Sequence, residues 1–423
     1  MNTKLRLAAL VGAAAIVAAA CGSTPASTAP SVAPSVTAPS VAPSTQASVA
    51  PSTGPTAAPL EGELTIWHSY GSGGGETGAF QKTLGRLLTA NPKLVVHVVV
   101  QPFSDIFNKW NTDVAAGGGA DMFIAPNDNL FSQSDAGVLQ DLTAALQGKL
   151  TGFSQVAVDG SQVGGKFFMV PESLKAVELW YDNTAVTTPP ATTDALLAAV
   201  KSGAIKLGLN QGIYDMFGFS GSFGGTLMDA TGKCVADQGG FADAFKYLTD
   251  LKAAGAKFYT DGNALKQDFQ TGKLNMVETG PWNTADFEKA LGTKLSVTPL
   301  PAGPTGKNAD PFTGTDGWYI NPNSKVIDLA TAFALQMVAT DSEQIMTNDA
   351  GHIPAAPGVT INDPIVKGGL TAAAQGLARP QNAQLGNFWG PLGDALNQVL
   401  DKASDPTTTV ANACKLMNTA NKM

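Results

Sequence analysis

Three of the six tryptophans lie in polar or glycine-rich stretches instead of periodic apolar runs. They are Trp282 in Thr-Gly-Pro-Trp-Asn, Trp318 in Thr-Asp-Gly-Trp-Tyr and Trp389 in Asn-Phe-Trp-Gly-Pro. A fourth, Trp67, stands at the end of the first strand-like run. Aromatic faces suit the C–H faces of sugar rings, and nearby amides and carboxylates suit sugar hydroxyls. Composition alone leaves two interpretations open, a set of ligand contacts or half-buried packing.

Two other segments resemble enzyme motifs, and both are incomplete. Residues 73–78 have the Gly-x-Gly-x-x-Gly spacing of a dinucleotide site, but the following strand ends without the acidic residue that binds a ribose. Residues 218–222, Gly-Phe-Ser-Gly-Ser, lack the last glycine of a nucleophile elbow. We therefore expect a flexible turn beside a cleft at 73–78, and a secreted hydrolase is only a minor alternative.

The composition argues against several classes of protein. Three Cys and three His are scattered along the chain, so we expect neither a metal site nor a cofactor. Of the 26 Lys and Arg, only Lys4 and Arg6 precede residue 61, so 24 basic residues face 34 acidic ones in 61–423. This acidic balance argues against binding to nucleic acid, which requires a basic patch.

The first 20 residues are typical of an export signal. A short basic start is followed by 14 apolar residues, 7–20, which suits a signal peptide and is short for a spanning helix. The small residues before Cys21 resemble a bacterial lipobox, with Ala18 in place of the usual leucine. In lipoproteins of this kind a lipid is attached to the cysteine thiol. The alternative is an ordinary secretory signal with Cys21 incidental.

Residues 21–60 are predicted to form a disordered linker behind the lipidated Cys21. Residues 22–60 contain eight prolines, many Ser, Thr and Ala, and no charged side chain. Such a segment cannot bury enough apolar surface to fold. Extended at about 3.1 Å per residue, it would reach up to roughly 120 Å between a membrane and the working domain.

The body, 61–423, alternates strand and helix patterns. Strands are predicted at 64–70, 94–100, 122–125, 179–181 and 274–278, and helices near 80–88, 104–114, 193–202 and 240–254. The β-α-β-α-β order predicts mainly parallel sheets flanked by helices, with ligands beyond the carboxyl ends of the strands. A single core of this length would be unusually large, so two α/β lobes are expected.

Seven segments of the body carry recognisable patterns in a fixed order. They are 64–69, 119–128, 138–142, 166–171, 179–182, 271–282 and 388–389. Together they resemble family 1 extracellular solute-binding proteins of ABC importers, the maltose-binding group. The resemblance implies a periplasmic-binding-protein-like fold with a ligand cleft between two lobes, 61–174 plus 300–340 and 178–298 plus 345–423. It implies a monomer that binds a carbohydrate without turnover and delivers it to ABC permease subunits, anchored by lipid outside the cytoplasm.

The same resemblance assigns candidate ligand residues. Asp128 matches a carboxylate that bonds sugar hydroxyls, Trp282 and Trp389 match stacking aromatics, and Tyr214 lies near a family tyrosine. The maltose-binding group has Trp, Arg and Glu where this chain has Ala125, Asn129 and Lys175. Maltose itself is therefore in doubt, while the carbohydrate class is retained.

Further candidates follow from their positions at predicted strand ends. Trp67, His68, Ser69 and Tyr70 end the first strand, and Asp316 and Trp318 follow a later strand-like run. Asn129 and Lys175 complete the set. Lys175 would contact the ligand or an acidic sugar substituent, or would pair with nearby Glu172 as a solvated surface pair.

Two cysteines, Cys234 and Cys414, remain after processing. An exported compartment is oxidising, so they form a disulfide or remain as two separate buried thiols. For the ligand, a non-sugar solute is the alternative to a carbohydrate, and the few basic residues in the candidate loops disfavour a phosphate.

Overall fold

The computed structural model describes residues 59–71 and 74–423. They belong to a compact unit that extends from Ala58 to Met423. The predicted signal peptide, Cys21 and the linker up to residue 58 lie outside the described residues. No helix of the described part combines the length and the apolar character that a membrane-spanning helix needs.

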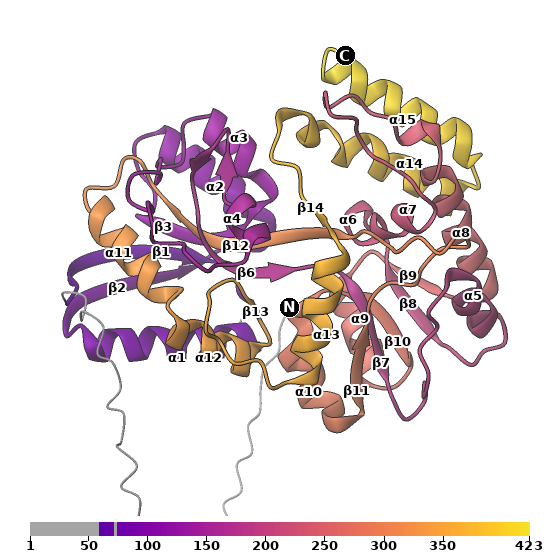
Figure 1. Cartoon of the computed structure of the whole chain (residues 1–423), viewed down its shortest axis with the longest axis horizontal. Helices are drawn as coiled ribbons and strands as arrows, with labels where there is room; N and C mark the ends of the chain where they lie inside the picture. Colours follow the sequence, from indigo (N-terminus) through magenta and orange to yellow (C-terminus); the bar gives the residue numbers. More distant parts are fainter. Residues whose placement is uncertain (1–58, 72–73) are drawn as a thin grey trace, which may run out of the picture. The chain divides into compact units, whose positions relative to one another are not determined.

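Seven strands form the first sheet, in the order β13-β6-β12-β3-β1-β2 with β14 paired to β12 (Figure 1). Their bounds are Glu61–His68 (β1), Lys93–Val100 (β2), Met122–Pro126 (β3), Val170–Lys175 (β6), Phe312–Ile320 (β12), Ile353–Pro354 (β13) and Leu377–Ala378 (β14). β1 runs parallel to β2 and β3, as the alternating pattern predicted. β12 runs antiparallel to β3 and β6, so the sheet is mixed.

Successive side chains of a strand point to opposite faces, and β1 therefore serves two core layers. Leu64 and Ile66 pack with α1 (Gly75–Ala90), α11 (Ile327–Met337) and α12 (Thr340–Ala350). Trp67 packs on the other face with α2 (Phe103–Ala115) and α3 (Leu130–Asp135). α2 begins directly after Pro102, whose fixed φ suits a helix start, one residue before the start at 104 that the sequence predicted.

Five strands form the second sheet, in the order β11-β7-β10-β8-β9. They are Glu178–Asp182 (β7), Leu207–Asn210 (β8), Lys257–Tyr259 (β9), Met276–Thr279 (β10) and Leu295–Thr298 (β11). One face packs on α5 (Thr193–Lys201), α8 (Phe241–Ala254), α14 (Trp389–Lys402) and α15 (Pro406–Ala420). The other packs on α9 (Gly262–Gln270) and α10 (Thr284–Leu291). A disulfide joins Cys234 to Cys414 of α15.

The remaining helices and strands complete the described part of the chain. They are η1 (Asn127–Asn129), α4 (Gln155–Asp159), the β4–β5 hairpin (Gln162–Val163 and Lys166–Phe167), α6 (Ile213–Met216), α7 (Gly218–Ser222), η2 (Ala236–Gln238), η3 (Pro281–Asn283), η4 (Gly292–Lys294), α13 (Pro364–Gln375) and η5 (Ala383–Asn387).

We call each sheet with its helices a lobe, and the chain crosses between the lobes several times. Residues 176–177 connect β6 to β7, and residues 299–311 connect β11 to β12. The sequence analysis assigned 345–423 to the second lobe, but β13 pairs with β6 and therefore lies on the first sheet. The chain reaches the second sheet again at α13, which packs on β11. Backbone pairing of so short a strand leaves no periodic pattern to detect in the sequence.

Two glycines of the first lobe lie where α10 of the second lobe approaches. A Cβ added at Gly75, the first residue of α1, would lie 2.1 Å from the Cβ of Ala285. One added at Gly351, which ends α12 with φ near +76°, would lie 2.2 Å from Thr284. Gly75 belongs to the segment that the sequence predicted to form a turn beside a cleft, and it allows α1 to contact α10 closely. Gly351 allows the end of α12 to do the same.

Candidate functional site

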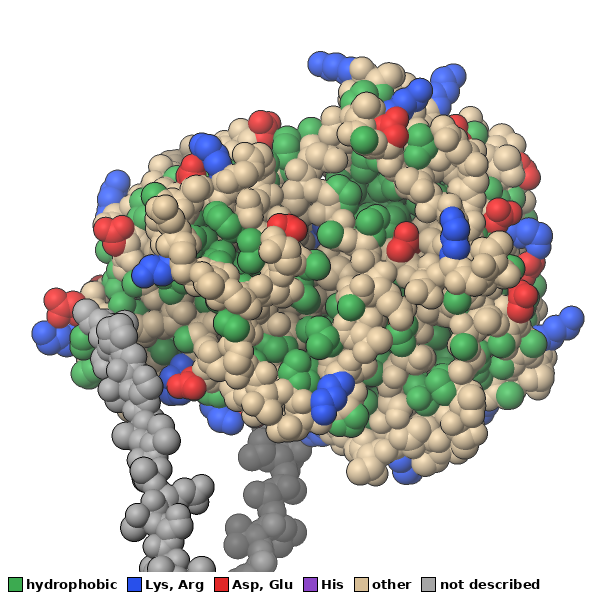
Figure 2. Space-filling view, in the orientation of Figure 1, with side chains coloured by type: hydrophobic (Ala, Val, Ile, Leu, Met, Phe, Trp, Pro, Cys, Tyr) green, Lys and Arg blue, Asp and Glu red, His purple; other side chains and the backbone are tan. Residues whose placement is uncertain are grey.

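A cavity of about 490 Å³ is lined by residues of both lobes, a size typical of small-molecule sites. The first lobe and the chain around β14 contribute Ser69, Tyr70, Glu76, Phe103, Ile124, Ala125, Pro126, Asp128, Ser173, Leu174, Lys175, Asp316, His352 and Arg379. The second lobe contributes Tyr214, Asp215, Pro281 and Trp282. On the face shown in Figure 2, the charged side chains of the described residues are scattered and do not form a basic patch.

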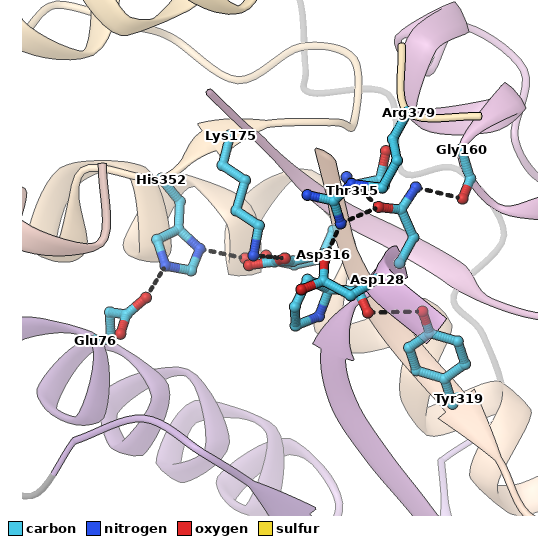
Figure 3. Close-up of polar contacts among 12 residues, drawn as sticks. Glu76, Asp128, Gly160, Lys175, Thr315, Asp316, Tyr319, His352 and Arg379 are labelled. Atoms are coloured by element: carbon cyan, nitrogen blue, oxygen red, sulfur yellow. Dashed lines mark hydrogen bonds and ion pairs between the residues drawn. The ribbon is translucent and has the colours of Figure 1, made fainter. Parts of the chain in front are cut away.

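Lys175 and Asp316 form an ion pair on the first-lobe side of the cavity (Figure 3). They lie on the neighbouring strands β6 and β12, and Lys175 Nζ is 2.7 Å from Asp316 Oδ1. Their side chains are only 14% and 18% exposed. The predicted alternative, a solvated pair of Lys175 with Glu172, is wrong, because Glu172 is buried and its Oε1 contacts His352.

Arg379 forms a second ion pair, with Asp128 (Figure 3). The arginine side chain is fully buried, and Nη1 also donates to Asn127 Oδ1 at 3.3 Å. Burial lowers the pKa of Arg379 to about 9. The sequence analysis missed Arg379. A usable signal exists, because the body contains only one other arginine and an arginine close to an aromatic ligand motif suits a buried ion pair.

His352 lies between two carboxylates at the edge of the same cavity (Figure 3). Its Nδ1 is 2.8 Å from Glu172 Oε1, and its Nε2 is 3.3 Å from Glu76 Oε1. Burial alone would lower the pKa of His352, but the two carboxylates raise it well above its usual value. His352 thus links the chain just before β13 to Glu172 on β6 and to Glu76 at the start of α1.

The second-lobe side of the cavity is aromatic. Trp282 follows β10 in the turn η3, and its ring folds back over Gly280, where a Cβ would lie 2.1 Å from the indole. Tyr214 lies on α6, with its ring centre 6.3 Å from that of Trp282. Lys175 Nζ is 6.0 Å from the centre of the Trp282 ring, so this face is within reach of the first lobe.

Two acidic side chains lie beside these rings without a basic partner among the residues that the structure describes. Asp215 lines the cavity, and burial raises its pKa to about 7. Glu278 on β10 is fully buried, and burial together with the nearby Asp215 raises its pKa well above the usual value. Asn210 donates its backbone N–H to Glu278 and its side chain to the Glu278 carbonyl. Both carboxyl groups therefore hold protons more tightly than exposed ones.

The structure brings seven of the twelve predicted ligand residues to the cavity. They are Ser69, Tyr70, Asp128, Lys175, Tyr214, Trp282 and Asp316. Asn129 and Trp389 do not line it. The residues that sequence reasoning missed include Glu76, Phe103, Asp215, His352 and Arg379.

Three predicted residues belong to the core instead. Trp67 packs edge-on against Trp110, with ring centres 5.9 Å apart, because it points to the α2 face of β1. His68 is buried against Phe80, and burial lowers its pKa. Trp318 is 1% exposed within the layer of α1 and α11. Their predicted ligand contacts are corrected by these positions.

The serine of the incomplete elbow has no access to solvent. Ser220 is 2% exposed, and its hydroxyl donates to the carbonyl of Phe217 at 2.7 Å. Its segment is the short helix α7, whose residues are all buried. The segment has a packing role in the second lobe.

Two α/β lobes with a cavity lined from both sides define the class of cleft-type solute-binding proteins. The chain belongs to the bacterial extracellular solute-binding protein family, whose model matches residues 79–372. The two-lobed α/β fold class expected from the sequence is confirmed.

Known relatives bind oligosaccharides. A maltotriose-binding protein of Pyrococcus abyssi is 24% identical over 359 residues, which cover 80% of this chain and 78% of the relative. A maltooligosaccharide ABC transporter solute-binding lipoprotein of Streptococcus pneumoniae is 22% identical over 336 residues, which cover 73% and 78%. The Thermus thermophilus maltotriose binding protein bound with maltotriose matches with a TM-score of 0.76 at 25% identity, covering 85% of this chain and 100% of that chain.

Proposed function

We propose that this protein captures a carbohydrate in the cavity between its lobes and delivers it to the transmembrane subunits of an ABC importer. The observation that carries the proposal is the pairing of an aromatic wall, Trp282 and Tyr214, with a wall of carboxylates and cations around Asp316. Aromatic rings suit the apolar faces of sugars, and charged groups make strong hydrogen bonds to hydroxyls. The sugar-binding names of the relatives support the same ligand class.

Capture requires the two walls to act together. A ligand that contacts both lobes has higher affinity for the closed state, and this difference alone shifts the population toward closure. Residues 176–177, between β6 and β7, are a short connection on which such a hinge motion would turn. The closed, loaded form is then the one presented to the permease.

We further propose that the mature protein is a monomer held at the outer side of the cell membrane by a lipid on Cys21. The lipobox-like sequence and the proline-rich segment after it support an anchor and a spacer. The streptococcal relative carries the word lipoprotein in its name. Replacing Cys21 with serine should shift the protein from the membrane fraction to the soluble fraction and abolish incorporation of a labelled fatty acid.

The first experiment is a titration of residues 58–423, which form one compact unit, with a panel of mono- and oligosaccharides. Tryptophan fluorescence and melting temperature are recorded together, because a ligand that binds the native state raises stability by mass action. A saturable change in both signals for one sugar and not for its epimers is the expected result. A flat response to the whole panel would contradict the carbohydrate assignment and favour a non-sugar solute.

A further inference from the structure

The indole of Trp389 lies next to Arg379 and outside the lining of the cavity. Arg379 lines the cavity, whereas Trp389, although partly exposed, does not. The guanidinium carbon is 5.9 Å from the centre of the Trp389 ring and 5.3 Å from that of Tyr214. It is also 5.9 Å from the centre of Phe312. The cation thus lies among three aromatic rings, of which Tyr214 lines the cavity and Phe312 belongs to the core.

This arrangement is fixed from several directions. The Arg379 side chain is fully buried, paired with Asp128 and in contact with Asn127. Guanidinium groups stack well on aromatic rings, so the rings also favour this position. The other cation of the cavity, Lys175, keeps 14% of its side chain exposed and lies 6.0 Å from Trp282. Trp282 is therefore accessible from the cavity, and Trp389 is not.

We infer that Arg379, held by Asp128, ends the cavity before Trp389 and so restricts the protein to short carbohydrates. The inference rests on the proposed function, since it takes a sugar to be the occupant of the cavity. A sugar stacked on Trp282 and Tyr214 would meet the pair of Asp128 and Arg379 where a longer chain would have to continue. Arg379 is a specificity-determining residue that acts by excluding additional sugar units.

The test compares affinities for a ladder of maltooligosaccharides, from maltose to maltoheptaose, by calorimetry. In the parent, affinity should stop rising after the first few sugar units. In Arg379→Ala, the ratio of long-chain to short-chain affinity should rise about tenfold, because the ring of Trp389 becomes available. Adding Trp389→Ala should remove this gain, while Trp389→Ala in the parent background should change affinity less than threefold. Arg86→Ala, the other arginine of the body, is the matched control and should keep the parental ladder.

An unchanged ladder in Arg379→Ala, or a large loss of affinity in the parent with Trp389→Ala, would overturn the inference. A second measurement does not depend on sugar binding. Quenching of Trp389 fluorescence by acrylamide, taken as the difference between proteins with Trp389 and with Trp389→Phe, should increase in Arg379→Ala. If no sugar of the ladder binds any variant, the carbohydrate proposal fails for these sugars, and quenching alone decides whether Arg379 shields Trp389. Cooperative urea unfolding of each variant establishes that it is folded.

Discussion

The two walls of the cavity differ in how their charges are balanced. On the first-lobe wall, Lys175 pairs with Asp316 and His352 lies between Glu172 and Glu76. On the second-lobe wall, aromatic rings dominate, and Asp215 and the underlying Glu278 have no basic partner among the described residues. One wall is thus preorganised by its own ion pairs, and the other presents flat aromatic surfaces and, at Asp215, a carboxyl group whose pKa burial raises to about 7.

This difference suggests a division of labour in ligand binding. Ion pairs formed before the ligand arrives fix the directions of hydrogen bonds and so favour selectivity among hydroxyl arrangements. We expect desolvation of Trp282 and Tyr214 to contribute most of the affinity, since aromatic anchors dominate many binding interfaces. We expect neither wall to suffice alone, because the proposed closure depends on contacts to both lobes.

Loss of the main aromatic surface should have the largest effect. Trp282→Ala is expected to weaken sugar binding by about 2–4 kcal/mol, which corresponds to a 30- to 1000-fold rise in Kd. Trp282→Phe retains a ring and should lose less than half of that free energy. Calorimetry with the sugar identified in the panel measures both. If Trp282→Ala binds the sugar as tightly as the parent, the residues of the first-lobe wall, and not Trp282, supply most of the binding free energy.

The unpaired carboxyl groups of the second wall should appear in the pH dependence of stability. The pKa of Asp215 is about 7 in the folded protein against 3.8 for an exposed aspartate, so the folded state holds a proton that the unfolded chain releases. Stability should therefore fall as pH rises from about 4 to 7. The raised pKa of His352 acts in the same direction, with stability lost as pH rises above 6.5 through its folded value.

Asp215→Asn should remove part of this decline and raise the free energy of unfolding at pH 8 by roughly 2 kcal/mol relative to the parent. Urea unfolding at pH 5 and pH 8 measures the change in slope. Asp105→Asn, at an exposed site in the first turn of α2, is the matched control and should leave the slope unchanged. Equal slopes in Asp215→Asn and the parent would show that this carboxyl group is not protonated by its burial.

The sequence predicted the architecture well where local pattern and sheet pairing agree. The parallel arrangement of β1, β2 and β3 followed from three β-branched or apolar runs separated by amphipathic helices. The strands β7 and β12 enter their sheets antiparallel after a lobe crossing, and β6 is antiparallel to β12. No local signal gives the direction of such a strand. The position of β13 could not be predicted either, because a strand of two residues shows no periodicity.

The structure places at the cavity several predicted side chains that leave the ends of strands, and places in the core those whose face is decided by alternation along a strand. Trp67 and Trp318 were plausible ligands by context, yet the pleat turns each of them into a core layer. Tyr70, two residues past β1, reaches the cavity. Arg379 and His352 come from distant parts of the chain, and only the folded sheets bring them to Asp128 and Glu172.

Closure of the cavity can be hindered by a substitution at the contact between α1 and α10, at a residue that does not line the cavity. Gly75→Ala would place a methyl group 2.1 Å from the Cβ of Ala285, so α1 and α10 must separate. Overpacking of this kind costs about 1–3 kcal/mol, and because it opposes closure we expect sugar affinity to fall about tenfold. Gly78→Ala lies on the same helix with no atom within 4 Å of the added carbon, and should bind as the parent does. Equal sugar affinities of the two variants would mean that the closed state has room for the added methyl group between α1 and α10.

The smallest effect is expected from the ion pair of the first wall. Asp316→Asn keeps the shape of the side chain but removes the charge that holds Lys175 Nζ at 2.7 Å. The pair is partly exposed, so its loss should cost about 1 kcal/mol and not the several kcal/mol of a fully buried pair. A freed ammonium would also compete with sugar for the face of Trp282, which lies within cation–π reach at 6.0 Å. Sugar binding should therefore weaken about fivefold, and a second change, Lys175→Met, should restore part of it by removing the competitor. If the double variant binds more weakly than Asp316→Asn alone, Lys175 itself contacts the sugar, and the first wall contributes affinity as well as direction.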